Sequence, residues 1–433
     1  MSCLQTDLYQ LTMAAGFWQA GKTQDRATFE MFVRRLPANR EYIVAAGLQQ
    51  AIEYLTCLSA TGEQIDYIRK LPQFAHVEPE FFEYLLDFRF TGDVFAVREG
   101  TPLFPGEPFL TLRAPLIEAQ VPETYLLSTL SFQSMIATKA TRVVRAAGGK
   151  SVVEFGTRRA HSPEAGVLAG RAAYIGGCAG TSNVETGFRY GVPVFGTAAH
   201  SFVLAFTTER ESYEKLQHLL REATVFLIDT YDTVHGARLV TELGKPMWGV
   251  RLDSGDVIDL SKKVRRILDD AGLREAKIMA TGDLDEPKLK SICEAGAPID
   301  SFGVGTALAT SSDAPNLSAV YKMVEIESQG TKRFVAKQST DKQTVPGAKQ
   351  VFRYKDRDVI AGVWECPSCQ PGSESSFALL RPVMLDGRLA GKLPNAEEAR
   401  DYCMRALEKI SPGHRVEYSR ELLDISAGQR GEA

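Results

Sequence analysis

The sequence predicts an α/β protein in which an irregular (β/α) barrel domain is joined to an α+β domain. Between about residues 150 and 306, short apolar runs alternate with helical patterns, as in parallel strands connected by helices. Polar residues follow nearly every one of these runs, which is typical of the converging loops of a barrel. The first hundred or so residues instead combine helices with short antiparallel strand patterns.

The length of 433 residues is too great for one ordinary hydrophobic core, so more than one domain is expected. We predict an N-terminal α+β domain at 1–118 and the barrel at 119–325. The C-terminal segment at 326–433 is expected to pack back on the N-terminal domain. The contents of 44% hydrophobic and 24% charged residues are those of a soluble globular protein.

The net charge of −4 and the lack of a basic tract argue against non-specific binding of nucleic acid. A bound anion must therefore be held by a local cluster of cations. The N-terminus has no signal-peptide pattern, and no apolar run approaches the ~20 residues that a membrane span needs. Seven cysteines, an odd number, fit a reducing compartment, so we expect a cytoplasmic protein.

The N-terminal region is predicted to contain two helices, one strand and a group of small antiparallel strands. The helices are expected at 6–20, with Thr6 as N-cap, and at 43–58. An alternating pattern predicts a strand at 27–33, and glycines and prolines between short apolar runs indicate the small strands at 92–115.

The next region is predicted to begin with a long helix at 122–147 and to continue with six strands, each followed by a polar tip. The strands and their tips are 151–155 with 156–159, 192–195 with 196–200, 225–228 with 229–232, 248–250 with 251–256, 277–280 with 281–283, and 301–304 with 305–306. Helices are expected from Ser162-Pro163 onward, at 257–271 and at 285–295. An open doubly wound sheet is the alternative, but it would concentrate its site at one switch point rather than at many tips.

The C-terminal segment is polar at 332–354 and has an amphipathic helix pattern at 393–409, and we expect the last ten residues to be frayed. Cys366 and Cys369 form a single Cys-x-x-Cys, whereas a structural zinc site needs four ligands. We interpret the pair as an incomplete metal knuckle or as no metal site, and zinc shared across a dimer stays open.

His200 is the most informative single residue. It follows the apolar run 192–195 and Gly196-Thr197, which we interpret as a buried strand and its carboxyl-end turn. A histidine there can serve as base, phosphate ligand or nucleophile. The alternative is a core histidine with satisfied hydrogen bonds, and the position at a strand tip favours a site.

Three arginines are candidate anion ligands. Arg158 and Arg159 follow Gly156-Thr157, where at least one could grip an anion bidentately, although adjacent arginines on a loop are usually only solvated. Arg251 ends an apolar strand, where an unpaired charge would be costly. A structural ion pair with the aspartates that follow it is the alternative.

Carboxylates from three consecutive tips could form an acidic ring. They are Asp229, Asp232, Asp253, Asp256, Asp283 and Asp285. Any one of them could merely cap a helix. Next to arginines, the ring suits a polyphosphate with Mg²⁺.

The last predicted strand closes with Gly303-Val304-Gly305-Thr306. Glycines allow backbone N–H groups to approach a phosphate, and the threonine hydroxyl adds a donor. Barrel enzymes often bind phosphate after their final strands, so we predict a phosphate site here.

Six ordered motifs resemble the nicotinate phosphoribosyltransferase family. They are Thr6-Asp-Leu-Tyr-Gln10, Phe155-Gly-Thr-Arg-Arg159, Gly196-Thr-Ala-Ala-His-Ser201, Ile228-Asp-Thr-Tyr-Asp232, Val250-Arg-Leu-Asp-Ser-Gly-Asp256, and Gly303-Val-Gly-Thr306 with Val320-Tyr-Lys-Met after it. Residues 346–353 also resemble this family's C-terminal segment, whereas the cysteine pair has no place in the match.

The resemblance implies an irregular α/β barrel, a second domain from the N-terminal part and returning C-terminal segments, and a homodimer with the site at its interface. It implies that nicotinate and 5-phosphoribosyl 1-pyrophosphate give nicotinate mononucleotide and pyrophosphate, with Mg²⁺ and with ATP as co-substrate. His200 would be phosphorylated by ATP, and Arg251 and Asp253 would complete the catalytic group.

The resemblance also implies the substrate-binding residues. Tyr9, from the other subunit, and Thr197 would lie against the pyridine ring, and Arg158 or Arg159 would hold its carboxylate or a phosphate. Asp253 and Asp256 would serve the ribose and the metal, without a dedicated protein metal site. The remaining implied contacts are Ser182, Asp229, Gly282, Gly303, Gly305 and Thr306, the 5′-phosphate lying on the last three.

Other functions stay open from the residues. Nicotinamide phosphoribosyltransferase has a neutral substrate, and the paired arginines favour an anionic ring. Quinolinate phosphoribosyltransferase needs no ATP-coupled histidine, and a barrel aldolase would want a Schiff-base lysine at a tip. A catalytically silent binding protein on the same scaffold is the most distant alternative.

Overall fold

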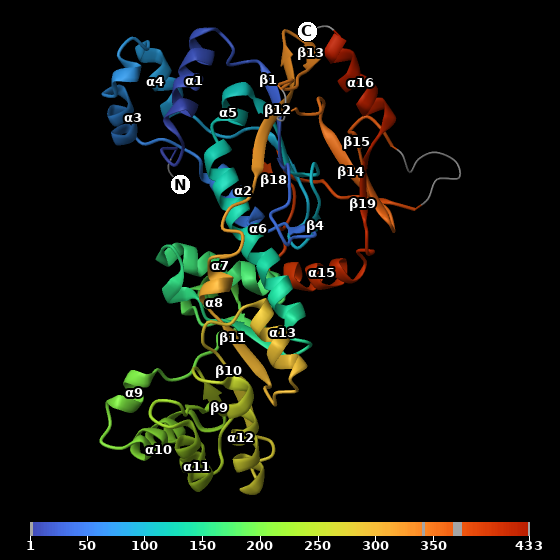
Figure 1. The fold of residues 1–433 in the computed structure, drawn as a ribbon. Coiled ribbons are helices and arrows are strands. Elements are labelled where there is room, and N and C mark those ends of the chain that lie inside the picture. The colour runs from blue at the N-terminus through green and yellow to red at the C-terminus, as the bar shows by residue number, and fades with distance from the viewer. Residues whose placement is uncertain (1–2, 340–342, 367–374, 432–433) are drawn as a thin grey trace. The chain divides into compact units, whose positions relative to one another are not determined.

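The computed structural model describes residues 3–339, 343–366 and 375–431 (Figure 1). The chain divides into two compact units. Unit 1 comprises Met1–Met135, Asn316–Asn395 and Asp401–Ala433, and unit 2 comprises Ile136–Pro315 and Ala396–Arg400. Within the described ranges, none of the helices combines the length and apolar character that a membrane crossing requires.

Unit 1 contains a seven-stranded antiparallel sheet whose strands come from both ends of the chain. In sheet order they are β13 (Thr331–Phe334), β12 (Ala319–Ser328), β1 (Arg26–Val33), β5 (Pro108–Pro115), β3 (Asp93–Ala96), β17 (Arg381–Leu385) and β18 (Arg388–Leu389). The central β1 is buried at nearly every position, because it is covered on both faces, and so lacks the alternation of a half-solvated strand. The predicted strand at 27–33 and the small antiparallel strands at 92–115 are confirmed.

Two smaller sheets complete the strands of unit 1. The four-stranded sheet is β16 (Phe377–Ala378), β14 (Lys349–Arg353), β15 (Arg357–Gly362) and β19 (Arg415–Tyr418), and the pair is β2 (Ile43–Val44) with β4 (Pro102–Leu103). The helices that lie wholly in this unit are α1 (Leu8–Gln19), α2 (Leu48–Cys57), α3 (Gly62–Arg69), α4 (Pro79–Leu86), α5 (Leu116–Gln120) and α16 (Arg420–Gly431). Helices α6 (Glu123–Ala146) and α15 (Ala396–Glu408) contribute residues to both units.

Three expectations for these helices are wrong at their ends. Thr6 does not cap α1, because its hydroxyl donates to the Val121 carbonyl at 3.2 Å and Asp7 takes the N-cap position. The helix expected at 43–58 begins only at Leu48, after Gly47 with a φ of +101°. The fraying expected for the last ten residues does not occur at 424–431, the part of them that the structure describes, since α16 continues to Gly431.

Unit 2 contains a six-stranded parallel sheet. In sheet order the strands are β7 (Gly180–Thr181), β6 (Ser151–Glu154), β11 (Ser301–Val304), β10 (Lys277–Ala280), β9 (Gly249–Leu252) and β8 (Val225–Leu227). The first strand of this series in the chain, β6, pairs with the last, β11. The helices are α7 (Pro163–Ile175), α8 (Val184–Tyr190), α9 (His200–Leu204), α10 (Glu209–Leu220), α11 (Thr233–Leu243), α12 (Val257–Asp270), α13 (Glu286–Glu294) and α14 (Thr306–Ala309).

Five of the six predicted strand regions are confirmed, and the one at 192–195 is wrong. Only Val194 forms a bridge, to Thr181, and the side chains of Val194 and Phe195 are 45% and 43% exposed. Periodicity alone does not settle the structure of so short an apolar run, and here Val192 is buried while the other three residues are exposed. The mixed α/β class is confirmed.

Candidate active site

The carboxyl ends of the parallel strands surround a pocket of about 590 Å³. This is the size of a small-molecule site, and ligands of parallel α/β sheets bind at this edge. Its lining residues come from five tips and from the segment before α9, and are Phe155, Thr157, Arg158, Arg159, Ser182, 195–200, Arg251, Asp253, 281–283, Gly303, Gly305 and Thr306.

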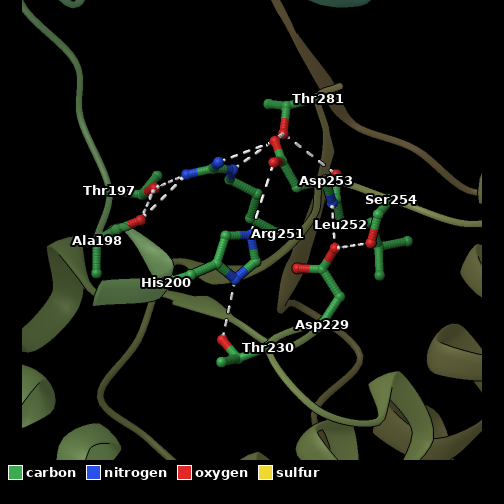
Figure 2. A network of polar contacts seen from close by, with 10 residues as sticks. All are labelled: Thr197, Ala198, His200, Asp229, Thr230, Arg251, Leu252, Asp253, Ser254 and Thr281. Atoms are coloured by element: carbon green, nitrogen blue, oxygen red, sulfur yellow. Dashed lines mark hydrogen bonds and ion pairs between the residues drawn. The ribbon is translucent and has the colours of Figure 1, made fainter. Parts of the chain in front are cut away.

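His200 is the first residue of α9 and lies in this pocket (Figure 2). Its Nδ1 is 3.1 Å from the Thr230 hydroxyl, and its Nε2 is 3.7 Å from Oδ2 of Asp253. The side chain is 41% exposed, so the ring is oriented from both sides yet open to a ligand. A core histidine with satisfied bonds, the alternative left by the sequence, does not describe this position.

Arg251 lies within β9, and its guanidinium connects three tips (Figure 2). Nε donates to the Thr281 hydroxyl at 2.9 Å, and Nη2 donates to Oδ1 of Asp253 at 2.9 Å. Nη1 donates to the Thr197 hydroxyl and to the Ala198 carbonyl. Arg251 and Asp253 form the ion pair that was the structural alternative for this arginine. Both residues also line the pocket, so the pair can contact a ligand as well.

Asp253 remains ionised in this network. Burial favours its neutral form, but the hydrogen bonds from Thr281 and Arg251, together with the charges of Arg251 and His200, lower the pKa of the carboxyl below its usual value. A carboxylate that is ionised at neutral pH can hold a cation or accept a hydrogen bond from a ribose hydroxyl.

Asp229 supports Asp253 from the neighbouring strand (Figure 2). Its Oδ2 accepts the backbone N–H of Asp253 at 3.1 Å and the Ser254 hydroxyl at 2.6 Å. Its Oδ1 is buried and has no hydrogen-bond partner among the described residues. A buried carboxylate oxygen without a partner is costly, so this atom is available to a ligand group that reaches it.

Arg158 and Arg159 both line the pocket, at the end of the 3₁₀ turn Thr157–Arg159. Both are exposed, and neither forms an ion pair with another residue that the structure describes. Two cations without a protein partner at the mouth of a pocket are suited to an anionic ligand.

Glu154, which the sequence analysis did not single out, holds the tips that carry these arginines and Ser182. Its side chain accepts the Thr181 hydroxyl at 2.6 Å and the Gly156 N–H, and its carbonyl accepts the Ser182 N–H at 2.9 Å. Burial raises the pKa of Glu154, although these two side-chain hydrogen bonds oppose the shift. The position at a strand end was visible in the sequence, but the buried contacts were not.

Two glycines at the pocket are required by packing. A Cβ on Gly282 would lie 2.0 Å from the Asp253 carbonyl oxygen, and its φ is +91°. A Cβ on Gly303 would lie 2.6 Å from the Phe155 ring and from Cγ2 of Thr281. Gly303 therefore serves tight packing in β11, while Gly305 and Thr306 form the turn into α14.

Several predicted site residues lie outside this pocket lining. Tyr9 is on α1 in unit 1, 48% exposed. Asp256, Asp232 and Asp285 are N-caps whose side chains accept backbone N–H groups of α12, α11 and α13. The acidic ring thus reduces to Asp253 and Asp283 in the lining, with Asp229 behind them.

The hydroxyls of Thr230 and Thr281, which contact His200 and Arg251, were not predicted from the sequence. Both occur within the quoted tips, but a threonine in a turn is too common to stand out. Within the described ranges, no group of three or more histidine, cysteine, aspartate or glutamate side chains is arranged to hold a metal. Cys369, and so the Cys366–Cys369 pair, lies outside the described residues.

Two family models match the chain. The model of the nicotinate phosphoribosyltransferase (NAPRTase) N-terminal domain matches residues 4–131, and that of the nicotinate phosphoribosyltransferase (NAPRTase) family matches residues 150–361. Both expected site regions, the N-terminal tyrosine segment and the parallel-strand tips, fall within the matched ranges.

Relatives match over most of their length. A nicotinate phosphoribosyltransferase of Mycobacterium tuberculosis is 43% identical over 421 residues, covering 95% of this chain and 88% of that protein. One of Bacillus subtilis is 44% identical over 359 residues, covering 81% and 72%. The crystal structure of human nicotinic acid phosphoribosyltransferase matches with a TM-score of 0.84 and 28% identity, covering 98% of this chain and 99% of that one.

Proposed function

The chain belongs to the nicotinate phosphoribosyltransferase family, and on this premise we propose that it is an enzyme that joins nicotinate to the phosphoribosyl group of 5-phosphoribosyl 1-pyrophosphate. The products are nicotinate mononucleotide and pyrophosphate, and ATP is hydrolysed in the course of NAD salvage. One observation carries the proposal: His200, Arg251 and Asp253 form a single polar network in the pocket at the strand ends.

His200 acts as the phosphate acceptor. A ring nitrogen attacks the γ-phosphorus of ATP, an N–P bond forms, the bond from that phosphorus to the β–γ bridging oxygen breaks, and ADP leaves. Water later cleaves the N–P bond and releases phosphate. The contacts at 3.1 Å to Thr230 and 3.7 Å to Asp253 orient the ring for this step.

The transfer itself depends on charge placement. The pyridine nitrogen attacks the anomeric carbon as the bond from that carbon to the pyrophosphate oxygen breaks, so negative charge grows on pyrophosphate. Arg251 stabilises that charge, and the Asp253 carboxylate lies where positive charge develops on the ribose. Arg158, Arg159, Thr197 and Ser182 receive the anionic ring, and Gly305 and Thr306 the 5′-phosphate.

Mg²⁺ fits this pocket as a partner of the substrate phosphates. Such a cation needs only one or two protein carboxylates, and Asp253 and Asp283 both line the pocket. When bound, it neutralises charge on the pyrophosphate.

The finer architecture belongs to the same proposal. In the sheet, β6 lies beside β11, as the closure of a (β/α) barrel requires. The gap that remains in such a barrel would lie between Val194 and β8. We place Tyr9 against the pyridine ring of a partner subunit in a cytoplasmic homodimer. This is supported by its half-exposed ring, which is available to a partner.

The test is pyrophosphate release with Mg²⁺ and 5-phosphoribosyl 1-pyrophosphate, comparing nicotinate with nicotinamide, with and without ATP. We expect release with nicotinate that ATP stimulates, and loss of the stimulation in His200→Ala. Turnover of nicotinamide instead would overturn the substrate, although every reported relative carries the nicotinate name. Quinolinate turnover without ATP, or no turnover at all, would each reject the proposal.

A further inference from the structure

A second cavity, of about 600 Å³, lies in unit 1 and shares no residue with the barrel pocket. It is bounded by α15, β14, β16 and the segment that leads to β19. We call it the C-terminal cavity; the wall residues used below are Tyr354, Lys355, Phe377, Tyr402, Arg405 and Lys409. Its volume equals that of the barrel pocket and is sufficient for a ligand of nucleotide size.

The wall of the C-terminal cavity carries an excess of positive charge. Lys355, Arg405 and Lys409 line it, and their side chains pair with no carboxylate among the described residues. Glu408 is the one carboxylate in the described wall, and Arg353 is already neutralised by Asp358 at 2.6 Å. The wall therefore carries an excess of about two positive charges, although the net charge of the chain is −4. This excess favours a ligand with two negative charges.

The rest of the wall is largely aromatic and apolar. Tyr354, Phe377 and Tyr402 contribute rings. The guanidinium groups of Arg357 and Arg98 lie over the rings of Tyr354 and Tyr402, each 4.7 Å from the ring centroid, and hold these rings in place. Such a wall accepts a planar ring, because aromatic surfaces provide large contact area with little loss of side-chain freedom.

Some polar atoms in the wall have no hydrogen-bond partner within the part of the chain that the structure describes. They are the Ser376 hydroxyl and both ring nitrogens of His414, although His414 Nε2 lies 3.2 Å from Oδ1 of Asp358. The His414 ring is fixed against Phe104, with centroids 4.8 Å apart. Unsatisfied buried polar groups beside a cavity are expected where a ligand supplies the missing partner.

We propose that the C-terminal cavity binds a mononucleotide, that is, a planar aromatic base joined through ribose to a phosphate monoester. The monoester carries a charge of about −1.5 to −2 at neutral pH, which matches the excess of cations on the wall. The base lies among the aromatic rings, and the phosphate meets Lys355, Arg405 and Lys409. An adenine nucleotide and a pyridine nucleotide share this chemistry.

The test is isothermal titration of the full-length protein with AMP and, separately, with nicotinate mononucleotide and inorganic phosphate. We expect Arg405→Glu to weaken mononucleotide binding at least tenfold. Arg420→Glu, the same charge reversal at a 96% exposed side chain of α16, leaves it unchanged. Arg251→Met, in the barrel, retains the binding event that Arg405→Glu loses. The comparison of AMP with nicotinate mononucleotide identifies the source of the ligand.

Three results would overturn the proposal: no binding of either nucleotide, wild-type binding in Arg405→Glu, or inorganic phosphate binding as tightly as AMP. Arg405 is exposed, so its variant should fold, and a thermal melt checks this. Pyrophosphate release without added nucleotide is expected to be unchanged in Arg405→Glu. If the wild-type protein does not release pyrophosphate, the proposed function is rejected, but the titration result is unaffected. The two proposals can therefore be rejected independently.

Discussion

Both units contain an ion pair close to their sheets, but only one of these pairs is open to solvent. In unit 1, Lys349 and Glu30 are 4% and 0% exposed and lie 2.7 Å apart. In unit 2, Arg251 and Asp253 are 13% and 26% exposed, and His200 beside them is 41% exposed. The closed pair can only serve the fold, whereas the open one can exchange a protein contact for a substrate contact.

The acidic partners of these pairs shift in opposite directions. At Glu30, burial raises the pKa of the carboxyl although Lys349 opposes the shift. At Asp253, burial is outweighed by hydrogen bonds from Thr281 and Arg251, which lower the pKa. The two carboxyls thus shift differently, because Asp253 is 26% exposed and retains partial solvation, whereas Glu30 is fully buried.

The largest effect on stability is expected when the cation of the buried Lys349–Glu30 pair is removed. Lys349→Met leaves Glu30 buried without a cation, and the free energy of unfolding should fall by about 3–5 kcal/mol. Denaturant unfolding measures this, and the double variant with Glu30→Leu should recover most of the loss. If the single variant unfolds at wild-type denaturant concentrations, the pair is not the structural element that its burial suggests.

The largest effect on turnover is expected when the cation of the solvent-accessible Arg251–Asp253 pair is removed. Arg251→Met should reduce kcat/KM for pyrophosphate release about 10²- to 10³-fold, because a charge that stabilises the leaving group is lost. Its unfolding free energy should fall by less than in Lys349→Met. Arg210→Met, which removes a surface ion pair with Glu214, is the matched control and should keep wild-type turnover.

A smaller, pH-dependent effect is expected at Glu107 in unit 1. Burial, the nearby Asp358 charge and the hydrogen bond to Asp358 raise its pKa well above the usual value of 4.5. The folded protein then holds a proton that the unfolded chain has released, so stability falls as pH rises above about 5, by up to about 1.4 kcal/mol per pH unit. Glu107→Gln should flatten this slope in unfolding measured from pH 5 to 8, and an unchanged slope would show that Glu107 is ionised.

The smallest effect is expected at the hydroxyl that orients His200. Thr230→Val removes the 3.1 Å contact to Nδ1 and should reduce the ATP stimulation about three- to tenfold, the value of one hydrogen bond. Thr230→Ser keeps the hydroxyl and should restore it. Equal rates in the valine and serine variants would show that His200 is oriented by Asp253 alone.

Two strands in unit 2 could be predicted from sequence with accurate bounds, whereas the runs before Asp229 and Arg251 differ from β8 and β9 by one or two residues at their ends. The runs at 277–280 and 301–304 are β10 and β11 without any shift. The run at 192–195 failed as a buried strand, because only Val192 is buried and the segment makes a single bridge, and a short apolar run does not show which side chains the fold will cover. The N-cap at Thr6 failed because its hydroxyl donates to the carbonyl of Val121, which is 115 residues away in the sequence.

For the pocket, the sequence indicated the charged members and the turn at 303–306, but not the hydroxyls that orient His200 and Arg251. His200, Arg251 and Asp253 were predicted from their places at strand ends, and all three line the pocket. Thr230 and Thr281 were not, because their roles depend on which tips become neighbours in the folded sheet. Asp256 was predicted as a site residue but is the N-cap of α12, because the sequence does not distinguish an N-cap aspartate from one that binds a ligand.

The order of strands in unit 1 has a consequence for synthesis on the ribosome. Strand β1 leaves the ribosome early, but its partner β12 begins at Ala319, and β17, the partner of β3, begins at Arg381. The parallel sheet of unit 2 is encoded without interruption between β6 and β11. The second unit in the sequence can therefore complete its sheet first, while the N-terminal strands wait with an unpaired edge for the last third of the chain.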